Sequence, residues 1–447
     1  MTAPVTLPLW LFVLISAFAT VSFATHFLFP SVRWFLRRRL EKAVERLNQR
    51  LERPIEPFRL LRRYDLMQRL LYHPDVTQAI VEHSATEGVR EDVAFERARR
   101  YAREIVPSFS AFTYFGLGLR GARLLSNSLY RVRVGDHQET PLKGIGTESA
   151  VIFVMNHRSN MDYVLVTYLA ANRSALSYAV GEWANVWPLS SLVRSTGAYF
   201  IRRTSRDPLY RRVMRRYVQM ATAGGVTQAI FLEGGLSLDG ALAPPKLGVI
   251  SYILGDLDLS ARDVVFVPVG LNYDRVLEDT VLIRAGEAGI RRFKASITRV
   301  LRTIAKQAWL RLTGRFHRFG YAAVSFGKPL SLRAHPELVA NPKTLADTLM
   351  TRIAGIIPIL PVPLLCHLLL KAPHSRAALD RAMTDLLGDD ARAHVRLPQG
   401  DLADAVETGL RALTERGFVE DRNGQFALTL RGIPVARYYA NSVAHLL

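Results

Sequence analysis

Short apolar runs alternate with longer helical patterns between residues 131 and 330, and this alternation constrains the fold more than any other feature of the sequence. The runs include SAVIFVMN, TQAIFLEGG and DVVFVPVGLNY, and segments with helical periodicity such as PLYRRVMRRYVQMA lie between them. Strands that are apolar on both faces and interleaved with helices are typical of parallel sheets. The sequence therefore predicts an α/β fold with a mostly parallel central sheet flanked by helices.

The segments around this region predict a chain of several parts. The predicted parts are an N-terminal transmembrane helix (1–30), a helical region (31–130), the α/β domain (131–350), an apolar proline-containing segment (351–372) and a small C-terminal α+β module of helices and a hairpin (373–447).

The first segment is long and apolar enough to cross a bilayer. From Leu7 to Phe29 no side chain carries a formal charge apart from His26, and about 20 apolar residues suffice for a membrane-spanning helix. A cleaved signal peptide is the alternative, because Ala17 and Ala19 match an A-x-A site. However, the segment lacks a basic beginning and stays apolar past that site, so we expect a transmembrane anchor.

Positive charge follows this segment and dominates the chain. There are 59 Lys and Arg against 39 Asp and Glu, a net charge of +20, which indicates anionic partners: nucleic acid, phospholipid headgroups or phosphorylated metabolites. Five cations crowd residues 33–42, as the positive-inside rule expects on the cytoplasmic side of a membrane, although a solvated helix face would also carry them. We therefore expect the body of the protein to face the cytoplasm, tethered to membrane phospholipid.

Two later segments permit more than one interpretation. Residues 353–370 are apolar but contain three prolines, which favours a buried or interfacial segment over a second membrane crossing. The single cysteine, Cys366, lies there and is expected to be a buried, inert thiol. Residues 373–447 predict helices and a hairpin that turns at residues 422–424, a pattern that resembles a winged helix. Acidic residues on its helix oppose phosphate, so we expect a structural or docking role and no nucleic-acid partner.

The stretch NHRSNMDY at 156–163 carries the sharpest chemical signal. His157 and Asp162 cannot meet on one regular helix, but they converge if His157 lies in the turn after a strand and Asp162 in the first turn of the next helix. A carboxylate that holds one ring nitrogen leaves the other nitrogen able to accept a proton. The chain has no G-x-S-x-G, Walker or H-E-x-x-H motif, so the hydroxyl to be deprotonated must belong to the substrate.

A structural interpretation of the same stretch stays open. Ser159 and Asp162 also match an S-x-x-D helix start, in which Asp162 merely caps the helix. The general-base hypothesis requires that the side chains of His157 and Asp162 meet, and that they are not buried away from any opening. Arg202 and Glu233 also follow apolar runs by a residue or two, and in parallel sheets such residues gather at one edge.

Four blocks occur in a characteristic order: NHRSNMDY (156–163), GAYFIRRTSRD (197–207), FLEGGLSLDGALAPPKLG (231–248) and VPVGLNYD (267–274). In order and approximate spacing they resemble the four blocks of the glycerolipid acyltransferase superfamily. The similarity is greatest to the bacterial membrane-bound glycerol-3-phosphate acyltransferases and the related dihydroxyacetone-phosphate acyltransferases. It extends over most of the chain from about residue 70.

This resemblance implies an O-acyltransferase of phospholipid biosynthesis at a bacterial-type inner (plasma) membrane, with residues 131–350 as the catalytic domain. The acyl group would pass from acyl-CoA or acyl carrier protein to the sn-1 hydroxyl of glycerol-3-phosphate, with His157 as general base and Asp162 as its partner. No metal and no bound cofactor is required, because the thioester supplies the activated acyl group. Backbone N–H groups near the start of the helix after Ser159 are expected to stabilise the oxyanion.

The resemblance also implies residues that bind the acceptor and its phosphate: Arg202, Arg203, Glu233, Gly234 and Lys246. A guanidinium fork suits phosphate, and glycine allows the backbone to approach the glycerol closely. The alternatives are an arginine that faces lipid, a Glu233 that only shapes a turn, and a Lys246 that is an ordinary surface residue.

One residue departs from the family pattern. Where the third block commonly reads Glu-Gly-x-Arg-Ser, this chain has Leu236 in place of the arginine. The acceptor is therefore less determined than the reaction, and dihydroxyacetone phosphate and lysophosphatidate are alternatives. The remaining alternative is a non-enzymatic membrane tether or nucleic-acid-binding protein, whose function would survive His157→Ala.

Overall fold

A computed structural model describes most of the chain. The described residues are 8–23, 38–39, 42–135, 142, 144–170, 174–181, 189–202, 205–289, 309, 313, 319–387 and 402–447. The chain forms two units, Met1–Pro54 and Ile55–Leu447. The domain boundaries predicted near residues 130, 350 and 372 all fall inside the second unit.

In the first unit, helix α1 (Leu9–Phe23) occupies the apolar segment. It is 15 residues long, and the remainder of the predicted span lies outside the described residues. Among the residues that are described, no helix is both long and apolar enough to cross a membrane. The predicted transmembrane helix is therefore not supported by the described part of the chain.

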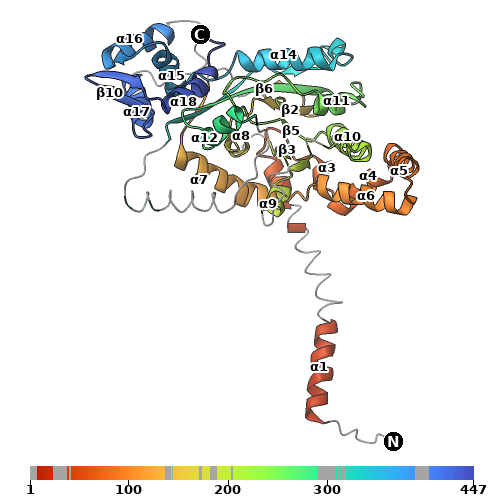
Figure 1. Ribbon diagram of the computed structural model, residues 1–447. Coiled ribbons are helices and arrows are strands. Elements are labelled where there is room, and N and C mark those ends of the chain that lie inside the picture. Colours follow the sequence, from red (N-terminus) through yellow and green to blue (C-terminus); the bar gives the residue numbers. More distant parts are fainter. Residues whose placement is uncertain are drawn as a thin grey trace, which may run out of the picture. The chain divides into compact units, whose positions relative to one another are not determined.

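An eight-stranded sheet forms the centre of the second unit (Figure 1). Its strands are β1 (Arg131–Val134), β2 (Ala150–Met155), β3 (Ser177–Gly181), β4 (Tyr199–Ile201), β5 (Gln228–Phe231), β6 (Val264–Tyr273), β7 (Tyr321–Phe326) and β8 (Leu330–Ser331). They run in the order β1-β7-β6-β2-β5-β3-β4, and β8 pairs with β6. Strands β6, β2, β5, β3 and β4 are mutually parallel, whereas β7 and β8 are antiparallel to β6. The prediction of a mostly parallel sheet is confirmed.

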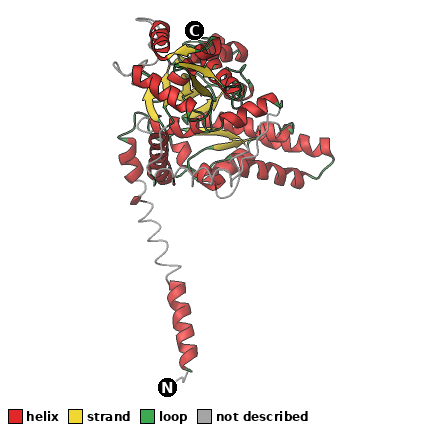
Figure 2. Ribbon diagram, turned by 60° about the vertical axis from the view of Figure 1, so that its left-hand side comes forward, coloured by secondary structure: helices red, strands yellow, loops and turns green. Residues whose placement is uncertain are grey.

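Helices cover both faces of this sheet (Figure 2). On β2, Val151, Phe153 and Met155 belong to one apolar core, and Ile152 and Val154 belong to the other, because successive side chains of a strand point to opposite faces. The second core is covered by α4 (Arg63–Leu71), α5 (Pro74–Glu87), α6 (Glu91–Ile105), α10 (Pro208–Ala223), α11 (Gly248–Leu254) and α14 (Pro342–Ala354). The first core is covered by α8 (Met161–Ala170), α12 (Asp279–Glu287), α15 (Pro361–Lys371), α16 (Arg376–Leu387), α17 (Leu402–Thr414) and α18 (Gly432–Asn441).

The proline-containing segment forms the buried helix α15 and the turn before it. Pro361 lies in its first turn, where the missing N–H costs nothing, and Cys366 on its inner face is fully buried, as predicted. After it, β10 (Val419–Arg422) and β11 (Gln425–Leu428) form the predicted hairpin. Its turn places Asn423 and Gly424 at φ angles of 55° and 80°, the left-handed backbone that a tight hairpin requires.

Asp274 joins the sheet to helix α15. Its carboxylate accepts the N–H of Tyr321 at 2.7 Å and the N–H of Val362 at 2.9 Å. Burial raises the pKa of Asp274 to about 7, although these two N–H groups and Arg131 act in the opposite direction.

This raised pKa predicts a pH-dependent stability. The ordinary aspartate pKa of about 3.9 applies to the unfolded chain, so the folded chain holds the proton more tightly. The contribution of Asp274 is then fully present below about pH 4 and is lost as the pH rises through about 7. We expect the free energy of unfolding to fall over this window, and to fall less steeply in Asp274→Asn. Denaturant titrations at pH 5, 6, 7 and 8 measure both slopes, and equal slopes would contradict the assignment.

Candidate active site

The pairing of three strands brings the polar ends of the sequence blocks together. Met155, the last residue of β2, lies opposite Phe231 on β5 and Val269 on β6. Because the three strands are parallel, the residues that follow β2 and β5 emerge at the same edge of the sheet as the end of β6. His157 and Glu233 are therefore neighbours in space.

Asn156 anchors the loop that follows β2. Its side-chain amide donates to the carbonyl oxygen of Leu271 at 2.9 Å, and its side-chain oxygen accepts the N–H of Leu271 at 2.8 Å. The side chain thereby replaces the backbone pairing that β2 no longer provides. These two hydrogen bonds fix the backbone just before His157 against β6.

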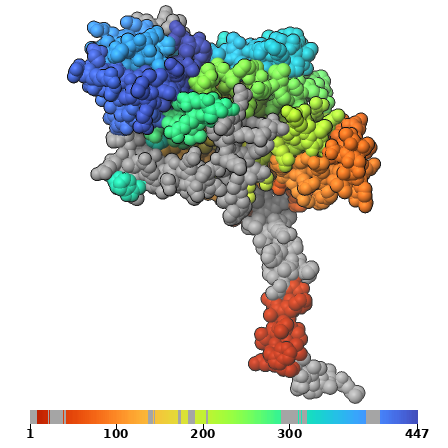
Figure 3. Space-filling view, in the orientation of Figure 1, coloured from red at the N-terminus to blue at the C-terminus, as the bar shows by residue number. Residues whose placement is uncertain are grey.

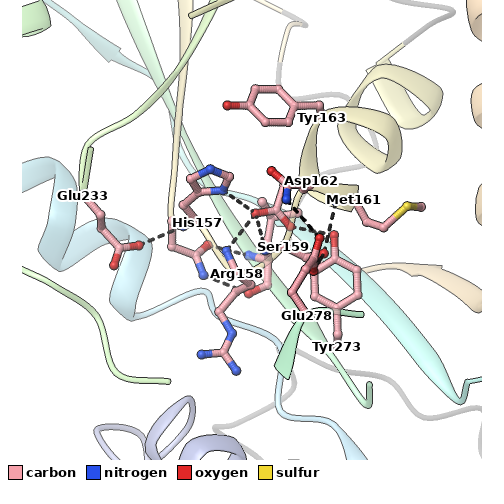
Figure 4. Close-up of polar contacts among 12 residues, drawn as sticks. His157, Arg158, Ser159, Met161, Asp162, Tyr163, Glu233, Tyr273 and Glu278 are labelled. Atoms are coloured by element: carbon pink, nitrogen blue, oxygen red, sulfur yellow. Dashed lines mark hydrogen bonds and ion pairs between the residues drawn. The ribbon is translucent and has the colours of Figure 1, made fainter. Parts of the chain in front are cut away.

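The side chains of His157 and Asp162 meet, as the sequence predicts (Figure 4). The Nδ1 atom of His157 lies 2.9 Å from Oδ2 of Asp162, and both side chains are buried, at 1% and 0% exposure. His157 lies in the loop after β2 and Asp162 in the first turn of α8. A carboxylate in this position favours the tautomer that carries its proton on Nδ1, so that Nε2 is the nitrogen for proton transfer.

Asp162 also organises the loop, so the structural interpretation of this residue is correct as well. The same Oδ2 atom accepts the N–H groups of Arg158 at 2.8 Å and Ser159 at 3.0 Å. Its Oδ1 atom accepts the hydroxyl of Tyr273, the last residue of β6, at 2.7 Å. Burial and the neighbouring Asp162 raise the pKa of Tyr273 well above its usual value, which keeps the hydroxyl protonated and able to donate.

Aromatic rings surround the imidazole. The His157 ring stacks on Phe231, with ring centroids 3.9 Å apart and planes inclined by 24°, and Tyr163 meets it edge-on at 5.6 Å. The first condition of the general-base hypothesis, contact between His157 and Asp162, is met. The second is not, because both side chains are buried, so an acceptor hydroxyl can reach the ring only if the side chains that cover it move.

Glu233 binds the backbone of His157. One carboxylate oxygen accepts the N–H of His157 at 2.8 Å, and the other accepts the N–H of Ala243 at 2.9 Å. The carbonyl oxygen of His157 in turn accepts the N–H of Ser237 at 3.0 Å. Burial raises the pKa of Glu233 to about 7, although the N–H groups of Ala243 and His157 act in the opposite direction. In this structure Glu233 therefore holds the β2 and β5 loops together, with both oxygens occupied by backbone.

Gly234 and Lys246 lie against each other in the third block. Gly234 has a φ angle of +68°, and a Cβ atom there would approach Cγ of Lys246 to 2.9 Å, so only glycine suits the position. The N–H of Lys246 donates to the carbonyl oxygen of Leu232 at 2.7 Å, while its side chain is exposed. No carboxylate of the described residues pairs with Lys246, which leaves its ammonium group available to an anion. Leu236, in place of the family's arginine, packs against the core.

Arg202 follows β4 and is engaged elsewhere. Its guanidinium group donates to both carboxylate oxygens of Glu104 on α6, at 2.8 and 2.5 Å, and lies over the rings of Tyr101 and Tyr210. Three strand spacings separate β4 from β2, about 14 Å at about 4.8 Å each. The structure therefore places Arg202 at the expected edge of the sheet but not beside His157. Arg203 lies outside the described residues.

Four of the N–H groups near the start of α8, where the oxyanion donors are expected, are already used. The N–H groups of Arg158 and Ser159 donate to Asp162, and the N–H of Met161 donates to Oγ of Ser159 at 3.1 Å. The N–H of Asp162 donates to the carbonyl oxygen of Ser159 at 3.0 Å. Two side chains and one backbone carbonyl of the same loop bind these four N–H groups, so in this structure the four do not point at a reacting carbonyl.

Glu278 is a residue of the site that sequence reasoning missed. It is the N-cap residue of α12, and its carboxylate accepts the hydroxyl of Ser159 at 2.8 Å and the amide of Asn160 at 3.0 Å. Burial raises the pKa of Glu278, against the effect of these two donors. No local pattern marks it, because it follows β6 by five residues and lies 119 positions from Ser159. Tyr273 could have been found, since it ends an apolar run in the fourth block.

Two family models match the chain. Residues 131–272 match the model described as Acyltransferase, and residues 308–447 match the one described as glycerol-3-phosphate acyltransferase C-terminal region. The first match contains His157, Asp162, Arg202, Glu233 and Lys246, and the second contains α15 and α18.

Curated relatives match over most of this chain. The glycerol-3-phosphate acyltransferase of Aeromonas hydrophila is 30% identical over 411 residues, which cover 85% of this chain and 49% of the relative. That of Pseudomonas putida is 30% identical over 421 residues, which cover 86% of this chain and 49% of the relative. This chain spans about half the length of these relatives. A solved 1-acyl-sn-glycerophosphate acyltransferase from Thermotoga maritima is 16% identical, with a TM-score of 0.30, over 61% of this chain and 92% of that one. The chain thus carries an Acyltransferase domain followed by a segment that matches the glycerol-3-phosphate acyltransferase C-terminal region, and over most of its length it is similar to the glycerol-3-phosphate acyltransferases.

Proposed function

We propose that this chain transfers a fatty acyl group from acyl-CoA or acyl carrier protein to the sn-1 hydroxyl of glycerol-3-phosphate. The observation that carries the proposal is the 2.9 Å contact between His157 and Asp162 at the end of a central parallel strand. The matched relatives, which bear the name glycerol-3-phosphate acyltransferase, support the choice of acceptor.

In the proposed reaction, Nε2 of His157 accepts the proton of the acceptor hydroxyl as its oxygen attacks the thioester carbonyl. Asp162 holds the ring and stabilises the imidazolium that forms. The tetrahedral intermediate then expels the thiol sulfur, which takes the proton from Nε2. The ester forms, the thioester breaks and the imidazole returns neutral, so the cycle needs no metal or bound cofactor.

The phosphate of the acceptor requires cations near this centre. Lys246 is exposed, follows the strand next to β2 and has no carboxylate partner among the described residues, which supports its role in phosphate binding. Arg202 could bind the phosphate only if its guanidinium group left the Glu104 carboxylate or bound both anions at once. We also propose that Arg203 binds the phosphate, and that Gly234 allows the backbone to approach the glycerol closely.

Acyl transfer to a defined acceptor tests this function. The purified full chain is incubated with radiolabelled glycerol-3-phosphate and either acyl-CoA or acyl carrier protein, beside His157→Ala. We expect lysophosphatidate from the wild type only. If dihydroxyacetone phosphate or lysophosphatidate is acylated and glycerol-3-phosphate is not, that compound is the acceptor and the proposed acceptor is wrong. No transfer to any of the three would favour the non-enzymatic membrane tether or nucleic-acid-binding protein.

We also propose that the protein works at the cytoplasmic face of a bacterial inner membrane, in contact with phospholipid. The uncharged segment from Leu7 to Phe29 and the five cations at 33–42 support this location. Flotation of the expressed chain with inner-membrane vesicles tests it, and recovery in the unbound fraction at low and high salt would contradict it.

Replacing Glu233 separates acceptor binding from positioning. In Glu233→Gln an amide NH₂ replaces one carboxylate oxygen and must face the N–H of His157 or Ala243, so the loop that carries the base shifts. We expect kcat to fall about 10- to 100-fold with the KM for glycerol-3-phosphate unchanged. Steady-state kinetics measure both constants. Direct contact between Glu233 and the acceptor in the ground state would raise KM instead, as we expect for the comparison variant Lys246→Met.

A further inference from the structure

The residue beside the base carries a buried positive charge. Arg158 is 3% exposed, and its guanidinium group points away from the His157 ring (Figure 4). Its Nη1 atom donates to the carbonyl oxygen of Gly240, and its Cζ atom lies 4.7 Å from the centroid of the Tyr438 ring. Nε and Nη2 are buried without a hydrogen-bond partner among the described residues. One carbonyl oxygen, the face of one aromatic ring and the electrostatic attraction of Glu233 therefore replace the water that this cation loses.

Tyr438 lies on α18, near the end of the C-terminal region, and the loop of the third block rests on the same helix. Gly240 has a φ angle of +90°, and a Cβ atom there would lie 1.7 Å from the carbonyl oxygen of Tyr438. The side chain of Asn441 donates to the carbonyl oxygen of Asp239 at 3.0 Å. The loop is thus pressed against α18 at a position that only glycine tolerates.

The same helix also reaches the residues that hold the start of α8. The hydroxyl of Tyr439 donates to Asp279 at 2.7 Å and accepts the N–H of Val276 at 2.9 Å. Asp279 is the first residue of α12, next to Glu278, whose carboxylate binds Ser159 and Asn160. In the space-filling view the C-terminal residues, in blue, lie directly against α12 (Figure 3).

We propose that α18 is a positioning element for the reaction, and that the ring of Tyr438, beneath Arg158, fixes the backbone that carries the His157 imidazole. The inference rests on the proposed function for its kinetic consequence. Tyr438 and Arg158 are positioning residues, since their contacts are with the loop and not with the imidazole. The C-terminal region then contributes to catalysis by holding the catalytic loop in place.

A pair of variants at one position tests this proposal. Tyr438→Leu removes the aromatic face, whereas Tyr438→Phe removes only a hydroxyl that has no partner among the described residues. We expect Tyr438→Leu to lower kcat by about 10- to 100-fold with the KM for glycerol-3-phosphate within about twofold, and Tyr438→Phe to keep the wild-type kcat. Equal rates for the two variants would overturn the proposal.

Arg158→Met covers the case in which Tyr438→Leu folds poorly. Methionine is of similar length and, unlike the guanidinium group, brings no N–H groups that need the hydrogen bonds Nε and Nη2 lack, so an apolar side chain suits this buried site. We expect the melting temperature of Arg158→Met to stay or rise while its kcat falls. A stable variant with the wild-type kcat would overturn the positioning role of Arg158.

Hydrogen exchange tests positioning without any assay of activity. In the full chain, Tyr438→Leu should speed amide exchange in a peptide spanning residues 156–163, and Tyr438→Phe should not. Unchanged exchange would overturn the proposal even if the wild type transferred no acyl group. Conversely, the wild type could be active while Tyr438→Leu has the same amide exchange and the same kcat. That result would leave the proposed function intact and contradict only the role of α18.

Discussion

Replacing His157 with alanine should lower the rate of acyl transfer to glycerol-3-phosphate by about 10²- to 10⁴-fold. A general base contributes this much when it accepts the proton of the attacking hydroxyl, which is the role proposed for His157, whose ring Asp162 holds at 2.9 Å. The loop itself should survive the change, because Asn156 and Glu233 bind its backbone and not the imidazole. Initial rates with radiolabelled acceptor measure the effect.

A second buried histidine provides the matched control. His83 on α5 is buried as well, its ring lies 3.1 Å from Arg97, and it lies outside the four sequence blocks. We expect His83→Ala to leave the rate within about twofold of the wild type. Added imidazole should restore part of the activity of His157→Ala, because the missing ring leaves a site between Phe231 and Tyr163. A His157→Ala rate within about tenfold of the wild type would contradict the role of His157 as base.

The central sheet and the contact between His157 and Asp162 could be predicted because their signals are local. Near-continuous apolar runs predict buried parallel strands, and the spacing of His157 and Asp162 permits contact only across a strand-to-helix turn. The structure confirms both. It also shows that the capping and general-base interpretations of Asp162 are compatible, since one carboxylate oxygen binds the ring and two backbone N–H groups.

The rest of the site depends on contacts between distant segments. Glu233 could be placed at a strand end, but the sequence does not reveal that its two oxygens bind the N–H groups of His157 and Ala243. The same lack of long-range information explains why Glu278 was missed. It also explains why the sequence does not reveal that four N–H groups at the start of α8 are already bound. Side chains of the same loop bind three of those groups and a backbone carbonyl binds the fourth, and such competition becomes visible only in three dimensions.

The ion pair of Arg202 shows the same limit at the second block. A guanidinium fork suits a carboxylate as well as it suits a phosphate, and in this structure Glu104 on α6 occupies it. The sequence identifies the arginine and its place at the end of a short strand. It cannot identify the partner, because Glu104 lies 98 positions earlier in the chain.

Replacing Asp162 with asparagine should lower the rate of acyl transfer by about 10²- to 10⁴-fold with the fold retained. The amide oxygen can take the place of Oδ2 and accept from His157, Arg158 and Ser159, while the amide NH₂ can donate to the hydroxyl oxygen of Tyr273. The hydrogen bonds are thus kept and the negative charge is lost. What disappears is the stabilisation of the imidazolium that forms when His157 accepts a proton.

Tyr273→Phe and a double variant separate this charge effect from a change in loop structure. Tyr273→Phe removes one donor to Asp162 and keeps the charge, so we expect a loss of less than about tenfold. Because Asp162 acts on the reaction through His157, the double variant His157→Ala/Asp162→Asn should be no slower than His157→Ala alone. Rates and melting temperatures of all four chains measure this. Losses that multiply in the double variant would mean that Asp162 acts by holding the loop together, since a carboxylate that serves only the imidazole has no further effect once the ring is gone.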